Sequence, residues 1–394
     1  MNLKNHPQQL KLSLLALLIG VLSLGQLQRW QLTNNIAVYV HELVMIGWLL
    51  LGLSQQQIRT KFINKLKTWF TSLGKLEQSW LIWLAFGLVI NQIFYQVSLT
   101  AWLYLARLSF YLLFIAWLKT LQLSITFKKF QLNATQLGWL IFGLLTLLLG
   151  LLQYLFLPDT RFLAILGWDD HYYRLISTQF DPNFTGMILV ITFIYLHQRK
   201  LPRAWQSAQT IMLSLLTIGL GLTLSRASYL SFALALLLLT ITKLIDFRKS
   251  LAFGLILLIT IGLAPKPTGE GVRLQRTSSI KARYASNSQT LQSLTTRQWL
   301  IGQGLFNTNQ LNQPPSTKTI ADHAQLPDNL LILIIQGTGL IGLVLLSLLT
   351  VKWTRGVFQK KPNFAIALTV TLLHSMFNNT LLQPFVLLML LAGQ

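Results

Sequence analysis

Cysteine is absent from the 394 residues, and charged residues are scarce. Without cysteine the chain forms no disulfide, no thiolate nucleophile and no cysteine-ligated metal site. Charged residues make up 11% of the chain, whereas an ordinary soluble domain has about 25%. Hydrophobic residues make up 53%, and the mean hydropathy is +0.54. Such a chain has too little polar surface to cover itself in water, so the sequence predicts an integral membrane protein.

Acidic residues are the scarcer of the two charged kinds, with 10 against 32 basic residues and a formal net charge of +22. The sequence has no Walker or dinucleotide-binding glycine loop, no HExxH, no cluster with metal-ligand spacing and no nucleophile elbow. We therefore expect no ATP-driven pump, no cofactor and no metal. No soluble domain is expected to bind nucleic acid, so we attribute the positive charge to basic cytoplasmic loops.

Apolar runs recur along the chain, and a bilayer core needs about 20 apolar residues in a helix. We expect an all-α bundle of eleven or twelve transmembrane helices in one polytopic domain, residues 1–394. Three of the segments are short enough to be tilted or re-entrant. The expected spans lie near residues 10–28, 36–53, 79–97, 99–118, 137–157, 183–197, 209–224, 227–244, 250–264, 329–350, 363–377 and 380–393.

Basic residues predict the orientation, because the cytoplasmic loops of membrane proteins are rich in Lys and Arg. With the N-terminus in the cytoplasm, alternate loops hold 20 of the 32 basic residues, including those around Lys65, Lys128 and Lys360. Both termini are cytoplasmic if the spans number twelve. The same alternation puts residues 158–182 and the large hydrophilic loop 265–328 on the extracytoplasmic side.

Two oppositely charged residues fall inside expected spans at similar depths from the outer side. Glu42 lies about one and a half turns into the second span, and Arg107 about two turns into the fourth. A charge in lipid is unfavourable unless it is paired. The sequence therefore predicts an ion pair that supports folding, with Glu42 as a proton-accepting group as the alternative.

The outer loop 265–328 is basic although long translocated loops are exempt from the positive-inside bias. Its charge therefore indicates either an anionic ligand or contact with lipid headgroups, and Arg273, Arg276 and Arg297 are candidates for such contacts. Four residues of the loop are spaced as one face of a short helix lying on the bundle: Leu291, Leu294, Gln298 and Ile301.

Five segments between residues 180 and 345 occur in an order that resembles a known family. They are Asp181-Pro182-Asn183-Phe184, Ser225-Arg226-Ala227, Thr277-Ser278-Ser279-Ile280-Lys281-Ala282-Arg283, Leu300-Ile301-Gly302-Gln303-Gly304-Leu305, and Asp328-Asn329-Leu330-Leu331 with Gly337-Thr338-Gly339-Leu340-Ile341-Gly342. Together they resemble the O-antigen ligase and O-antigen polymerase superfamily of bacterial membrane glycosyltransferases. The resemblance implies a GT-C-like bundle in the bacterial inner membrane and a role in polysaccharide biosynthesis for the cell envelope. It also implies transfer of a glycan from a polyprenyl (undecaprenyl) diphosphate carrier to a glycan or lipid-glycan acceptor.

The resemblance implies roles for single residues as well. Arg226 and Arg283 match arginines that would hold the diphosphate. Asp328 stands where the family often has His, so the general base is Asp328, or His323 five residues earlier, or no side chain at all. By its position before an apolar helical run, Asp328 is also expected to be the N-cap of that helix. Two polar neighbours are expected to bind substrate: Ser225 and Asn329.

The expected chemistry is coherent without the family. Displacing a diphosphate from an anomeric carbon builds negative charge that fixed guanidinium groups stabilise, and a carboxylate or imidazole takes the proton of the acceptor hydroxyl. Polymerase and ligase are not distinguished. Two other classes stay open: a transporter or flippase of lipid-linked sugars, which predicts inverted repeats, and a peptidoglycan glycosyltransferase of the shape, elongation, division and sporulation type.

Overall fold

The computed structural model describes residues 6–33, 36–95, 97–127, 130–199, 201–267, 271–275, 277–307 and 327–393, and most of them are helical. The α-helices in chain order are α1 (His6–Ser23), α2 (Val40–Ser54), α3 (Gln56–Thr71), α4 (Lys75–Tyr95), α5 (Leu99–Leu121), α6 (Ala134–Phe156), α7 (Pro182–His197), α8 (Arg203–Leu222), α9 (Arg226–Ile241), α10 (Phe247–Leu263), α11 (Ser278–Gln292), α12 (Thr296–Ile301), α13 (Leu330–Lys360), α14 (Pro362–Asn378) and α15 (Pro384–Ala392). Short 3-10 helices are η2 (Gly25–Gln28), η3 (Arg161–Leu166), η4 (Ser177–Gln179) and η5 (Thr380–Leu382). Two antiparallel hairpins pair β1 (Arg29–Thr33) with β2 (Ile36–Tyr39), and β3 (Ser124–Phe127) with β4 (Phe130–Asn133).

Each of the twelve expected spans coincides with a helix, which confirms the helical class. Among the described residues, four helices are long and apolar enough to cross a membrane, namely α4, α5, α6 and α13, and residues 8–23, α2, α7 and α9 form shorter apolar helices. Segment 380–393 does not form one continuous span. It consists of η5 and the nine-residue α15, whose rise of about 14 Å is half a bilayer core. A new helix starts here because Pro384 occupies its first turn and the Gln383 side chain caps it.

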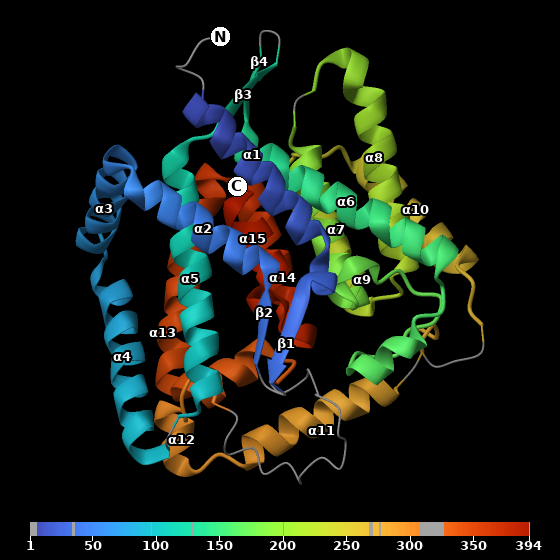
Figure 1. The fold of residues 1–394 in the computed structure, drawn as a ribbon. Helices are drawn as coiled ribbons and strands as arrows, with labels where there is room; N and C mark the ends of the chain where they lie inside the picture. Colours follow the sequence, from blue (N-terminus) through green and yellow to red (C-terminus); the bar gives the residue numbers. More distant parts are fainter. Residues whose placement is uncertain are drawn as a thin grey trace.

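Loops expected on the cytoplasmic side meet at one end of the bundle, which carries β3 and β4 (Figure 1). We call it the β3–β4 end. Lys119 at the end of α5 is within electrostatic range of Lys65 on α3 and of Lys361 between α13 and α14. Near the N-terminus, the Gln8 Nε2 donates to the Ser124 carbonyl at 3.0 Å. These contacts bring together loops that the expected alternation puts on one side of a membrane.

The opposite end carries α11 and α12, and we call it the α11 end (Figure 1). There the Arg226 Nη1 donates to the Leu274 carbonyl in the loop before α11, at 3.1 Å. The Arg174 Nε donates to the Thr223 carbonyl at the turn between α8 and α9, at 3.0 Å. The two segments expected outside the membrane therefore share this end with the start of α9.

The start of α2 differs from the expectation, because residues 36–39 form strand β2 rather than helix. Glu42 therefore lies in the first turn of α2, where its Oε2 accepts from the Tyr39 backbone N at 3.1 Å. Its Oε1 lies 2.6 Å from the Arg107 Nε and accepts from the Tyr111 hydroxyl at 2.6 Å. The predicted Glu42–Arg107 pair is confirmed. Because the β1–β2 hairpin precedes α2, Glu42 lies at the start of that helix and not further along it.

Helix α13 is broken at Gly339, whose φ of 68° and ψ of −177° are not helical. Three carbonyls beside the break find partners outside the helix. Those of Gln336 and Gly337 accept from the backbone N of Gln303 (2.8 Å) and of Gly304 (3.2 Å), and that of Thr338 accepts from the Trp83 Nε1 at 3.0 Å. An irregular backbone in a membrane helix requires such partners. The segment Gly302-Gln303-Gly304 after α12 is thus joined to the segment Gln336-Gly337-Thr338-Gly339 of α13 by two backbone hydrogen bonds.

The helix expected on the loop from Leu291 to Ile301 is also broken. Helix α11 ends at Gln292, and Thr295 starts α12 by accepting from the Gln298 backbone N while the Gln298 side chain accepts from the Thr295 backbone N. The single-helix prediction is wrong because this capping box begins a new helix in the middle of the apolar face. Leu294 and Gln298 are nevertheless buried as that face requires.

Two central helices are shorter than the neighbouring α6. Helices α7 and α9 have 16 residues each, and α6 has 23, which corresponds to about 24 Å against about 34 Å. The Ser177 hydroxyl in η4 donates to the Thr146 carbonyl in the middle of α6 at 2.8 Å. The segment before α7 therefore reaches into the bundle as far as the middle of α6, and α7 begins there rather than level with the end of α6.

Candidate active site at the α11 end

Two residues singled out by the sequence, 45 positions apart, meet at the α11 end. The Arg283 Nε on α11 lies 3.2 Å from the Asp328 Oδ2, two residues before α13 begins. Their side chains are 30% and 41% exposed. The pair is therefore open to a ligand.

One other aspartate, Asp169, is within electrostatic range of this pair. Burial raises the pKa of Asp328, the adjacent Arg283 opposes that shift, and the Asp169 carboxylate adds to it. Burial also raises the pKa of Asp181, and Asp169 again adds to the shift. Asp169 is therefore within electrostatic range of both carboxylates.

The N-cap of α13 is Asn329, which corrects the expectation that Asp328 has this role. The Asn329 Oδ1 accepts from the backbone N of Leu331 (2.9 Å) and of Ile332 (3.3 Å), and its Nδ2 donates to the Met376 carbonyl at 2.9 Å. Both Asp and Asn are good N-caps, and the helix begins one residue later than the sequence indicated. The Asp328 carboxylate is thereby left to Arg283.

Arg226 is the first residue of α9 and is half-buried. Its contact with the Leu274 carbonyl ties α9 to the chain that leads into α11. Among the described residues, no hydrogen bond or ion pair joins Arg226 to Arg283 or to Asp328. The convergence of the two arginines on one diphosphate therefore stays a prediction.

A chain of buried hydrogen bonds connects α7, α9 and α14 beside Arg226. The Ser225 hydroxyl, which caps α9, donates to the Asn183 Oδ1 at 2.7 Å. The Ser228 hydroxyl donates to Ser225 at 2.9 Å and lies 3.0 Å from the His374 Nε2. The His374 Nδ1 lies 2.6 Å from the Thr380 hydroxyl. His374 is thus the core hydrogen-bonding group of this chain.

This buried chain lies close to the Arg283–Asp328 pair. Arg283 is within electrostatic range of the His374 ring, and the Asn379 backbone N, just after α14, donates to the Asp328 carbonyl at 2.6 Å. The Asn378 Nδ2 and the Gln179 Nε2 are buried without a hydrogen-bond partner in the described part of the chain. Polar atoms therefore continue from the surface pair into the bundle.

The remaining predicted site residues are spread over the α11 end. Arg297 on α12 is exposed, and its guanidinium lies 3.6 Å from the centre of the Phe94 ring at the end of α4. Arg273 is exposed in the loop before α11. His323 and Arg276 lie outside the described residues, so the choice between His323 and Asp328 as the base is left to experiment.

Sequence reasoning missed the participation of Asp169, Ser228 and Thr380. Asp169 gave no signal beyond its place in a segment expected outside. Ser228 is three positions after the helix-capping Ser225, a spacing that brings two side chains together on one face of a helix. Within the described residues, no three His, Cys, Asp or Glu side chains are arranged to hold a metal ion.

No protein-family model matches the chain, and no curated protein sequence is significantly similar to it.

Proposed function

We propose that the protein is a metal-independent, inverting glycosyltransferase with a GT-C-like bundle. It transfers a glycan from a polyprenyl diphosphate carrier to a hydroxyl acceptor at the outer face of the membrane. The contact between Arg283 and Asp328 carries the proposal, because it combines a phosphate-binding group and a proton acceptor at one accessible place. The apolar helices of the bundle provide a hydrophobic surface for the polyprenyl tail of the carrier.

The transfer requires one bond to form as another breaks. The acceptor oxygen attacks the anomeric carbon from the face opposite the diphosphate, and the bond from that carbon to the diphosphate oxygen breaks with its electron pair. The hydroxyl proton passes to the Asp328 carboxylate. The guanidinium groups of Arg283 and Arg226 stabilise the charge on the departing diphosphate.

The contact between Arg283 and Asp328 also suggests how substrate binding prepares the site. Without substrate, Arg283 holds the Asp328 carboxylate. A diphosphate is the stronger acceptor for a guanidinium fork, so its arrival would draw Arg283 away. Asp328 would then lose its positive neighbour as the acceptor hydroxyl enters, and the carboxylate would become a better base.

A transporter of lipid-linked sugars is the second candidate, because the break of α13 at Gly339 is a feature of transporters whose broken helices line their binding sites. The three carbonyls of Gln336, Gly337 and Thr338 already have protein partners, however, and so are not available to coordinate an ion. We therefore favour the transferase. The shape and division type of peptidoglycan glycosyltransferase remains a third candidate, and polymerase and ligase remain two forms of the first.

The test is glycan transfer by the purified full chain reconstituted in lipid. Arg283→Lys and Arg226→Lys keep the charge and lose the bidentate fork, so we expect turnover to fall by about 10²–10³. Arg161→Lys is the matched control, because Arg161 is exposed in the segment before α7 and pairs with Asp159. Turnover near that of the wild type in both site variants would overturn the diphosphate role.

The same assay assigns the base. Asp328→Asn removes the base without touching the cap, since Asn329 caps α13. If Asp328→Asn is inactive and His323→Ala is active, Asp328 is the base, and the reverse result gives the role to His323. Full turnover in both means that neither is required. Transport of the lipid-linked sugar without transfer would identify the second candidate instead.

A further inference from the structure

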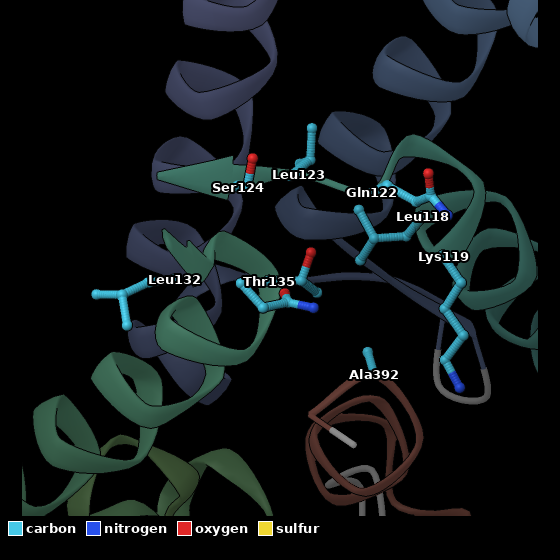
Figure 2. Close-up of a pocket in the computed structure, with 9 residues that line it drawn as sticks. Leu118, Lys119, Gln122, Leu123, Ser124, Leu132, Thr135 and Ala392 are labelled. Carbon is cyan, nitrogen blue, oxygen red and sulfur yellow. The ribbon is translucent and has the colours of Figure 1, made fainter. Parts of the chain in front are cut away.

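A hollow of about 430 Å³ lies at the β3–β4 end, far from the candidate active site. It is lined by the end of α5, by strands β3 and β4, by the first turn of α6 and by Ala392 near the C-terminus. Figure 2 shows Lys119, Thr135, Ser124 and Ala392 around it. Its volume falls within the range of small-molecule sites. Apolar and polar side chains contribute to the same wall, as an amphipathic ligand requires.

One lysine lines this hollow, and two lysines from other elements are within electrostatic range of it. The lining residue is Lys119, and the other two are Lys65 and Lys361. In the described part of the chain, none of the three forms an ion pair with a carboxylate. Like charges brought together without a counter-charge repel each other, and an anion between them would relieve the repulsion.

A hydroxyl on the wall of the hollow adds a hydrogen-bond donor to the lysines. Thr135 lines the hollow and is only 8% exposed. Its hydroxyl has no hydrogen-bond partner among the described residues, so it is available to donate to a molecule in the hollow. Thr135 lies in the first turn of α6, where the helix dipole favours an anion.

We propose that this hollow binds a phosphate-bearing anion, with the Lys119 ammonium and the Thr135 hydroxyl as its donors. The surrounding Leu118, Leu123 and Leu132 make the phosphate of an anionic lipid headgroup the favoured source, because they would contact the glycerol and the first acyl carbons. Basic pockets between membrane helices bind headgroups of this kind. A free phosphate compound is the other source of the same chemistry. This site does not depend on the proposed transferase activity.

The experiment measures the thermal stability of the purified full chain in neutral detergent. The probes are tetraoleoyl cardiolipin, phosphatidylcholine as the neutral lipid, and sodium phosphate at constant ionic strength. A ligand that binds the folded state raises the unfolding temperature with a saturable concentration dependence. We expect cardiolipin to do so and phosphatidylcholine not to. If phosphate alone does so, the site takes a free phosphate compound, and if neither anion does so, the proposal is wrong.

Variants separate this site from a merely basic surface. Lys119→Ala and Thr135→Val should each raise the half-saturating concentration of cardiolipin about tenfold or more, and Lys119→Arg should not. Lys249→Ala is the matched control, because Lys249 is an exposed lysine in the first turn of α10 and does not line the hollow. Equal effects of Lys119→Ala and Lys249→Ala would overturn the proposal. Should Lys119→Ala not fold, Lys361→Ala and Thr135→Val decide by the same criterion.

Discussion

Two arginine–carboxylate pairs lie in different regions of the molecule, and their surroundings differ more than their chemistry. In the pair near the β1–β2 hairpin, the Glu42 and Arg107 side chains are 10% and 24% exposed, and Glu42 also accepts from Tyr39 and Tyr111. In the Arg283–Asp328 pair both side chains are more exposed. Within the described residues Arg283 is the only hydrogen-bond donor to the Asp328 carboxylate. A buried pair whose carboxylate has several hydrogen-bond donors stabilises the fold. An accessible pair whose carboxylate has one donor is free to exchange that partner for a ligand.

The largest expected effect tests the buried pair. Glu42→Gln or Arg107→Gln alone leaves one charge buried without its partner, and we expect either change to lower the free energy of unfolding by about 3–5 kcal/mol. The double variant should be more stable than either single variant. Unfolding of the purified protein in detergent, followed by circular dichroism, measures all three.

Arg283→Gln provides the matched control for that comparison. Because the Arg283–Asp328 pair is half-exposed, its loss should change the free energy of unfolding by about 1 kcal/mol or less. Losses of equal size in Arg107→Gln and Arg283→Gln would contradict the distinction between the two regions. A double variant no more stable than the worse single variant would show that Glu42 and Arg107 do not act together.

The second largest expected effect compares the stability contributions of the neighbouring residues Asn329 and Asp328 in the candidate site. Asn329→Ala removes the N-cap of α13 and should lower stability by about 1 kcal/mol, whereas Asp328→Ala should change it less. Thermal unfolding of the two variants, matched in expression and detergent, measures the difference. A larger loss in Asp328→Ala would return the cap to Asp328.

The helices and the buried pair were predictable because their signals are local or strongly constrained. Hydropathy located a helix at each of the twelve expected spans but did not indicate α3 or α11. The high free energy of an unpaired charge in lipid indicated that Glu42 and Arg107 meet. The pairing of Arg283 with Asp328 did not follow from spacing. The sequence allowed both residues to lie at one end without indicating that they touch.

The missed features depend on contacts between distant segments or on shifts of one residue. The apolar run around Gly339 has the composition of one continuous helix, and the break becomes favourable only because Gln303 and Gly304 supply backbone donors. The contact between Ser228 and His374 joins residues 146 positions apart. The cap of α13 moved by one residue because neighbouring Asp and Asn have nearly equal capping strength.

The smallest expected effect concerns the pH dependence of glycan transfer. It tests the Arg283–Asp328 pair by changing the nearby Asp169. If Asp328 is the base, only its ionised form is active, so activity is lost as the pH falls through the pKa of that carboxyl. Asp169 raises this pKa by like-charge repulsion. Asp169→Asn removes the repulsion, lowers the pKa of Asp328 and should move the acidic limb of the profile to lower pH.

The measurement is kcat against pH for the wild type, Asp169→Asn and Asp159→Asn in the reconstituted transfer assay. Asp159 is the matched control, because it is exposed in the same segment, pairs with Arg161 and is not among the groups that act on Asp328. A limb that moves to lower pH in Asp169→Asn alone identifies Asp328 as the titrating group. A limb that moves equally in both variants reports the general surface charge. A limb that stays in place in both belongs to another residue, and the Arg283–Asp328 pair would then bind substrate without taking its proton.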